Sequence, residues 1–252
     1  MKKASFLTAT AVAGMMMACS TSTRHAQVNM AIDEQQNQPG DSTHYGLACD
    51  GCTDSILVFL PNSGGDPDTF NILDAVRDRR VFGRPHVGDR VAIVVNREDS
   101  AKADIVINLD RLTGQWTYQV MPKLRRRAGM EGVSQQQPPA ALPDSVMKKI
   151  MVPCEVGFVL NGDGTARPFS TIPRSAFATG SPVEYPRLKH YREWRISNGR
   201  LLLTETKLDS LGQSQLVSCD TAQFVLMRRD TLVLSVDGVE QGYKRATPPV
   251  SL

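Results

Sequence analysis

The sequence predicts a mainly β protein, in which an eight-stranded antiparallel barrel follows a small β-rich region. Three observations lead to this prediction. Apolar and polar residues alternate with a period of two through the C-terminal half, turn pairs such as Asn198-Gly199 separate the alternating segments, and no heptad or fixed-period repeat is present. A chain of 252 residues is long enough to bury a sizeable core inside such a fold.

The barrel is expected over residues 111–246. Its strands are predicted near 115–121, 155–160, 165–169, 189–197, 200–206, 222–227, 231–236 and 240–244. Short turns between consecutive strands favour an up-and-down barrel, because closure removes exposed strand edges. An open β-sandwich is the alternative. A barrel of this size either holds one small ligand or is filled by its own side chains.

The first 19 residues are typical of a lipoprotein signal peptide. Lys2 and Lys3 form a basic start, residues 4–18 are apolar or small, and Cys19 follows a small residue as in a bacterial lipobox. Acylation of Cys19 would anchor the chain in a membrane. We therefore expect a lipid-anchored protein of the cell envelope, on the outer membrane, with the membrane face left open; an ordinary signal peptide is the alternative.

Residues 20–44 are rich in Ser, Thr, Gln and Asn and lack aromatic side chains before position 45, so we expect a flexible tether. Residues 45–110 form the small β-rich region, with strands predicted at 56–60, 90–95 and 105–109. Residues 125–145 are a polar insertion, and a short helix is expected to begin near Asp144.

Charge and motifs exclude several classes of function. A formal net charge of +3, part of it from Lys2 and Lys3, gives no electrostatic case for binding nucleic acid. The four histidines form no HExxH motif, and no G-x-S-x-G motif is present. We therefore expect a protein that is not an enzyme and uses no cofactor.

Six aromatic residues of the predicted barrel are the candidate ligand-binding set: Trp116, Tyr118, Phe158, Tyr191, Trp194 and Phe224. Side chains of interior parity would line an apolar cavity suited to a small apolar ligand. The alternative is that these rings simply fill the barrel.

Four cysteines remain if Cys19 is acylated: Cys49, Cys52, Cys154 and Cys219. An even number in an oxidising envelope predicts up to two disulfides, with the pairing left open. Cys49 and Cys52 are spaced for a local disulfide or for thiol–disulfide exchange. Together with His44 they would offer the soft ligands that Cu(I) or Zn²⁺ prefers.

The opening strand L-T-G-Q-W at 112–116 resembles the first strand of lipocalin-type barrels. The segments at 157–160, 162–164, 191–194 and 198–204 are similar to later strands of lipocalin-like lipoproteins of the Bacteroidetes. This resemblance covers roughly residues 110–246, and it implies a β-barrel lipoprotein without catalytic residues. Cys49 and Cys52 before a strand also resemble the Cys-x-x-Cys of NlpE-type lipoproteins, which act in copper homeostasis and adhesion.

The leading hypothesis is an envelope lipoprotein whose barrel has a non-enzymatic binding role, for a small apolar ligand or an envelope partner protein. The alternative is a metal- or redox-responsive envelope stress lipoprotein acting through Cys49 and Cys52.

Overall fold

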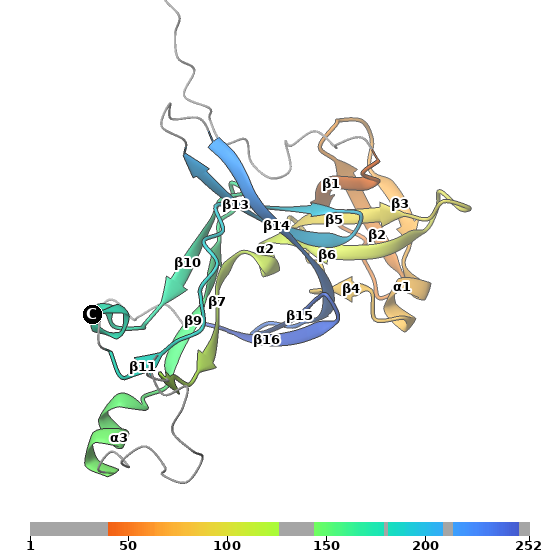
Figure 1. Ribbon diagram of the computed structural model, residues 1–252. Helices are drawn as coiled ribbons and strands as arrows, with labels where there is room; N and C mark the ends of the chain where they lie inside the picture. The colour runs from red at the N-terminus through yellow and green to blue at the C-terminus, as the bar shows by residue number, and fades with distance from the viewer. Residues whose placement is uncertain (1–39, 126–143, 179–180, 209–213, 247–252) are drawn as a thin grey trace, which may run out of the picture.

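The computed structural model describes residues 40–125, 144–178, 181–208 and 214–246, and these form two main sheets that lie next to one another (Figure 1). Sheet A has six strands in the order β3-β2-β1-β5-β6-β4, antiparallel except for the β4–β6 pair. Its elements are β1 (Thr43–Ala48), β2 (Ile56–Pro61), β3 (Asp68–Asn71), α1 (Leu73–Arg77), β4 (Val81–Phe82), β5 (Arg90–Val95) and β6 (Ala103–Asn108). Helix α2 (Leu109–Leu112) leads from sheet A into the second sheet.

Sheet B is the predicted barrel, with eight antiparallel strands in the order β10-β9-β7-β16-β15-β14-β13-β12. Its strands are β7 (Gly114–Val120), β9 (Cys154–Leu160), β10 (Ala166–Ser170), β12 (Glu193–Ser197), β13 (Arg200–Leu208), β14 (Ser214–Met227), β15 (Thr231–Val236) and β16 (Val239–Arg245). All eight expected strands are present, and strands that follow one another within the barrel are neighbours. The fourth begins at Glu193, four residues later than the predicted start at 189.

The barrel is nearly closed, with two weak seams. β12 meets β10 through a single bridge between Thr165 and Glu193. The Ala166 N–H donates to the Arg192 carbonyl at 2.7 Å, and the Trp194 N–H donates to the Gly164 carbonyl at 2.8 Å. β16 meets β7 over two residue pairs only, Lys244 with Thr117 and Arg245 with Trp116. A barrel rather than an open sandwich is therefore the architecture of sheet B.

Two tight turns have the backbone that their sequence predicts. Asn198 and Gly199 have φ values of 49° and 73°, and Asp237 and Gly238 have φ values of 51° and 80°. Positive φ at both central residues is the type I′ conformation, whose twist matches that of the flanking strands. These turns fix the register of the β12–β13 and β15–β16 hairpins.

Sheet A has three more strands than the sequence predicted. β1 begins at Thr43, two residues inside the predicted tether. The cause is a set of hydrogen bonds to the distant β12–β13 turn: Asn198 Oδ1 accepts from the Ser42 N–H at 3.0 Å, and Asn198 Nδ2 donates to the Gly40 carbonyl at 3.1 Å. The rest of the predicted tether and the signal peptide lie outside the described residues.

Four smaller elements lie at the end of the barrel away from sheet A, which we call the far end (Figure 1). α3 (Asp144–Ile150) begins where the sequence predicted a helix, and η1 (Arg174–Phe177) follows β10. β8 (Lys123–Leu124) and β11 (Val183–Glu184) form a two-stranded antiparallel sheet that extends from β7.

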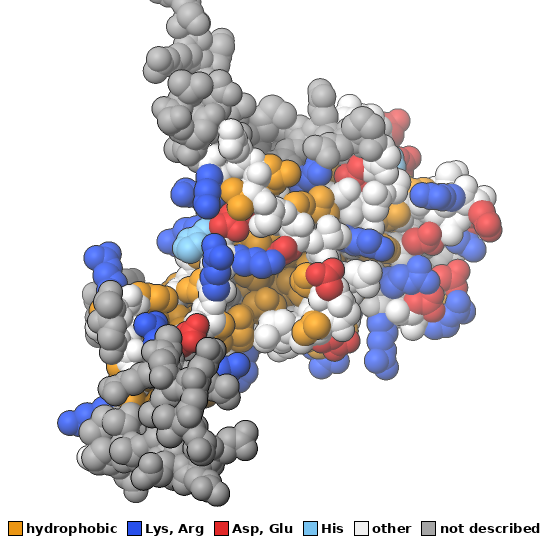
Figure 2. Space-filling model, viewed as in Figure 1, with side chains coloured by type: hydrophobic (Ala, Val, Ile, Leu, Met, Phe, Trp, Pro, Cys, Tyr) orange, Lys and Arg blue, Asp and Glu red, His pale blue; other side chains and the backbone are white. Residues whose placement is uncertain are grey.

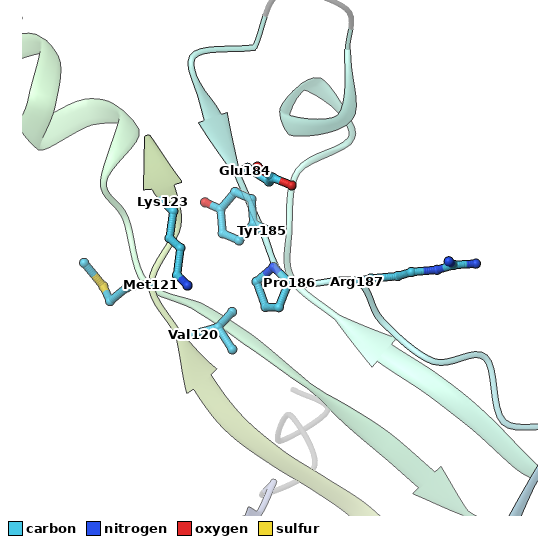
Figure 3. A pocket seen from close by; sticks show the side chains of 7 residues that line it. All are labelled: Val120, Met121, Lys123, Glu184, Tyr185, Pro186 and Arg187. Carbon is cyan, nitrogen blue, oxygen red and sulfur yellow. The ribbon is translucent and has the colours of Figure 1, made fainter. Parts of the chain in front are cut away.

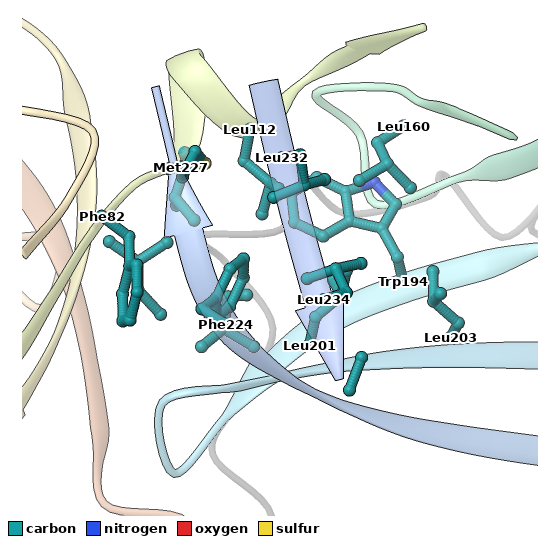
Figure 4. Close-up of a cluster of buried hydrophobic side chains, with 14 of the residues drawn as sticks. Phe82, Leu112, Leu160, Trp194, Leu201, Leu203, Phe224, Met227, Leu232 and Leu234 are labelled. Carbon is teal, nitrogen blue, oxygen red and sulfur yellow. The ribbon is translucent and has the colours of Figure 1, made fainter. Parts of the chain in front are cut away.

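One hydrophobic core joins sheet A to the barrel. Phe82 of sheet A packs on Phe224 of β14, with ring centroids 5.1 Å apart (Figure 4). Leu109 and Leu112 of α2 are fully buried in the same core. We call it the main core; its barrel members include Trp116, Phe158, Leu160, Trp194, Leu201, Leu203, Met227, Leu232 and Leu234. The barrel end next to sheet A is therefore sealed by apolar packing.

Tyr45 forms a polar link across this junction, because its hydroxyl donates to the Ile196 carbonyl at 2.7 Å. Tyr45→Phe removes the donor and leaves a buried carbonyl, so we expect the free energy of unfolding to fall by about 1–2 kcal/mol in urea titrations. Burial raises the pKa of Tyr45. Its contribution is present below the unfolded-state pKa of about 10 and is lost at higher pH. The variant should therefore lose stability less steeply above that pH; equal slopes would contradict the assignment.

Candidate functional site

Four of the six predicted aromatic ligand residues lie in the main core. Trp116, Trp194, Phe158 and Phe224 have exposed fractions of 0%, 1%, 3% and 8%. They pack against aliphatic side chains of both sheets, and they line neither of the two pockets described below. Their contacts are those of side chains that fill the barrel. A ligand-binding role for them stays a prediction.

Both tryptophans also have their indole N–H groups satisfied within the protein. Trp116 Nε1 donates to the Leu112 carbonyl at 2.7 Å, and Trp194 Nε1 donates to the Asn161 carbonyl at 2.9 Å. The Arg245 guanidinium lies over the Trp116 ring at 4.3 Å from its centroid. These contacts place both rings in the structural frame of the barrel.

The remaining two, Tyr118 and Tyr191, lie farther along the barrel and are half-buried. Tyr118 meets Tyr243 of β16 edge to face at 5.4 Å, and Phe158 contacts Tyr243 at 5.0 Å. The Tyr191 hydroxyl donates to Asp220 Oδ2, which also pairs with Lys189 Nζ at 2.5 Å. The interior of the barrel thus changes from wholly apolar near sheet A to tyrosines around a carboxylate toward the far end.

The environment of these tyrosines keeps them protonated. Burial, together with the hydrogen bond to Asp220, raises the pKa of Tyr191. Burial and the neighbouring Tyr118 and Asp220 raise the pKa of Tyr243. Both hydroxyl groups therefore stay neutral over the physiological pH range.

A pocket of about 490 Å³ lies at the far end, where β7 gives way to the β8–β11 sheet (Figure 3). Its apolar lining comes from Val120, Met121, Tyr185 and Pro186, and its charged lining from Lys123, Glu184 and Arg187. This volume lies within the range of about 300–1,000 Å³ that is typical of small-molecule sites. We call it the end pocket. None of the six predicted ligand residues lines it.

The floor of the end pocket rests on a separate hydrophobic cluster, which we call the end core. Its buried members are Cys154, Val156, Ile172 and Ala176, and Tyr118, Val120, Tyr185 and Leu188 pack against them. The Cys154 thiol donates to the Tyr185 hydroxyl at 3.4 Å, and the Tyr185 hydroxyl donates to the Val152 carbonyl at 3.3 Å. The pocket wall formed by Val120 and Tyr185 is thus packed against the barrel. The Tyr118 ring packs on the same cluster and contacts Tyr243 inside the barrel.

The space-filling view shows how apolar the barrel side of the molecule is (Figure 2). Hydrophobic side chains gather between the strands of sheet B, and Lys and Arg side chains lie around them. Apolar side chains near the end pocket are also exposed, with exposed fractions of 54% for Met121, 47% for Leu124 and 63% for Phe177. By contrast, a second pocket of about 440 Å³ beside sheet A is lined by polar groups such as Asn96, Asp104 and Asn198.

The four described cysteines are free thiols, so the expected disulfides are not formed here. The Cys52 thiol donates to the Cys49 carbonyl at 3.1 Å and accepts from the Val58 N–H at 3.3 Å. Cys154 lies on β9 and Cys219 on β14, and these strands are not neighbours in the sheet order, so the two cannot pair without rearranging the barrel.

No metal site is assembled within the described part of the chain. Across residues 40–125, 144–178, 181–208 and 214–246, no group of three or more His, Cys, Asp or Glu side chains is placed to hold an ion. His44 is exposed on β1 and is not joined to Cys49 and Cys52 in such a group. The metal- or redox-responsive role of these cysteines stays a prediction.

The predicted anchor residue, Cys19, lies outside the described residues. Over the residues that the structure describes, no helix has the length and apolar character needed to cross a bilayer.

Comparisons of the chain with protein-family models, with curated proteins and with solved structures returned no match. Sequence reasoning missed the end pocket, because Met121, Lys123 and Arg187 carry no motif and are brought together only by the β8–β11 pairing. It also missed Asp220 and Tyr243. The alternation of β14 and β16 was a usable signal for these two, since both residues have the interior parity of their strands.

Proposed function

We propose that this protein is a lipid-anchored envelope protein with a non-enzymatic binding role, and that the far end of its barrel binds a small, largely apolar molecule. The end pocket is the observation that carries the proposal, because it combines a suitable volume of about 490 Å³ with apolar walls on a firmly packed floor. The barrel interior next to sheet A is filled, so binding deep inside the barrel would require the main core to open.

Binding of a neutral apolar fluorescent dye such as Nile red tests this proposal. The probe is added to the full chain carrying Cys19→Ser, which removes the predicted acylation site. We expect saturable binding with one site per chain. The double variant Met121→Ser/Tyr185→Ser removes two apolar walls and should weaken the affinity about tenfold, which corresponds to about 1.4 kcal/mol of lost apolar contact.

Val239→Ser is the matched control, because Val239 is a 70% exposed apolar residue outside the end pocket. This variant should bind the dye as the parent chain does. Equal affinity in all three proteins, or no saturable binding by the parent chain, would contradict a binding site in the end pocket.

A further inference from the structure

The end pocket has an uneven distribution of charge that indicates the kind of molecule it accepts. Lys123 and Glu184 are opposite one another in the β8–β11 register, yet no ion pair joins them. The Lys123 side chain runs inward along the pocket toward Val120 and Pro186, whereas the Glu184 carboxylate points away (Figure 3). Of the three charged side chains that line the pocket, Lys123 is the one that runs into it in this view.

Arg187 adds a second cation at the rim, and its side chain extends away from Lys123 (Figure 3). Among the ion pairs of the described residues, none uses Lys123 or Arg187. Within the described part of the chain, the exposed Lys123 ammonium has no carboxylate partner. Placed beside apolar walls, it is complementary to an anion that is attached to an apolar group.

Part of the apolar lining of the pocket is open to solvent. Met121 lines the pocket, and its side chain is 54% exposed. A hydrocarbon chain could thus lie along Val120, Met121 and Tyr185 while its head group stays near the Lys123 ammonium.

We infer that the end pocket recognises a free single-chain amphiphile with an anionic head group, such as a carboxylate, through Lys123 at the head and apolar contacts along the tail. This inference rests on the proposed function and specifies its ligand class. It favours a free molecule over a bilayer, because the pocket has a volume of about 490 Å³, and this is the scale of one small ligand.

Isothermal titration calorimetry with decanoate and 1-decanol separates the head group from the tail, because the two probes share one hydrocarbon chain. Both are titrated below the concentration at which they aggregate, into the full chain carrying Cys19→Ser. We expect decanoate to bind about fivefold more tightly than 1-decanol, the preference that one partly exposed ion pair supports. Added salt should reduce this preference.

Lys123→Met keeps the apolar stem and removes the charge, so it should abolish the preference for decanoate while leaving 1-decanol binding unchanged. Arg187→Met should reduce the preference for decanoate less than Lys123→Met does. Lys207→Met is the matched control, because Lys207 is an exposed lysine on β13 outside the end pocket, and its substitution changes the net charge equally.

Three outcomes would overturn the inference in distinguishable ways. If both probes bind equally, or Lys123→Met behaves as Lys207→Met, the pocket binds apolar molecules without recognising an anion, and only the inference fails. If neither probe binds, the proposed function fails as well. If neither free probe binds but the chain sediments with phosphatidylglycerol vesicles, the far end recognises a membrane surface instead of a free amphiphile.

Discussion

Trp116→Ala is expected to lower the free energy of unfolding by about 3–5 kcal/mol, the usual cost of deleting a buried large aromatic side chain. Trp116 is fully buried, and its ring lies in the core that joins the barrel to sheet A. The substitution leaves a cavity, removes the hydrogen bond to the Leu112 carbonyl, and takes away the ring beneath Arg245. Urea denaturation followed by far-ultraviolet circular dichroism measures the loss.

Trp116→Phe separates the loss of apolar packing from the loss of the hydrogen bond, since it keeps most of the apolar contact and removes the N–H. It should lower the free energy of unfolding less than the alanine substitution does. If Trp116→Ala were nearly neutral in stability but altered ligand binding, the ring would belong to a ligand site and not to the structural frame of the barrel.

Arg245→Met is expected to lower the free energy of unfolding by about 3 kcal/mol, because Arg245 closes the seam between β16 and β7. Its guanidinium donates to the Thr113 carbonyl at 2.8 Å, to the Arg229 carbonyl at 3.0 Å and to the Arg111 carbonyl. Only two residue pairs join these strands, so the side chain provides much of the contact at that seam. Thermal unfolding and native-state hydrogen exchange of β16 measure the effect.

Arg245→Lys is the informative comparison, because it keeps the charge but loses the planar fork that reaches several carbonyls. We expect it to recover little of the lost stability. Full recovery by lysine would mean that charge alone, and not the fork of hydrogen bonds, holds the seam.

The barrel could be predicted from the sequence because its signals are local. Period-two alternation sets the inward face of each strand, and Asn198-Gly199 and Asp237-Gly238 demand positive φ, which sets the two hairpin registers. The late start of β12 was less predictable. Residues 189–192 alternate like a strand, but Lys189 and Tyr191 are directed to Asp220 by side-chain contacts that strand patterns do not encode.

Sheet A was only partly predictable, because its extra strands depend on distant partners. β1 begins with the polar residues Thr43 and His44, which the sequence pattern assigned to the end of the tether. It forms because β2 and β5 pair with it on either side and Asn198 holds its start. β4 has two residues and pairs in parallel with β6, an arrangement that local sequence does not indicate.

The candidate site was also predictable only where the signal is local in the sequence. Residues of high hydrophobicity and interior parity, such as Trp116 and Trp194, were readily found, but those properties identify a core side chain as well as a ligand contact. The end pocket combines a strand end with a segment more than 60 positions later in the chain. Only the β8–β11 pairing brings Lys123 next to Tyr185 and Pro186, and sequence patterns carry no signal for that contact.

Native mass spectrometry of the Cys19→Ser chain with added decanoate tests the binding proposal most directly. The proposal predicts one bound decanoate per chain, released on denaturation, and a marked loss of that complex in Met121→Ser/Tyr185→Ser but not in Val239→Ser. A bare polypeptide mass at every decanoate concentration, with the chain shown to be folded by circular dichroism, would contradict it.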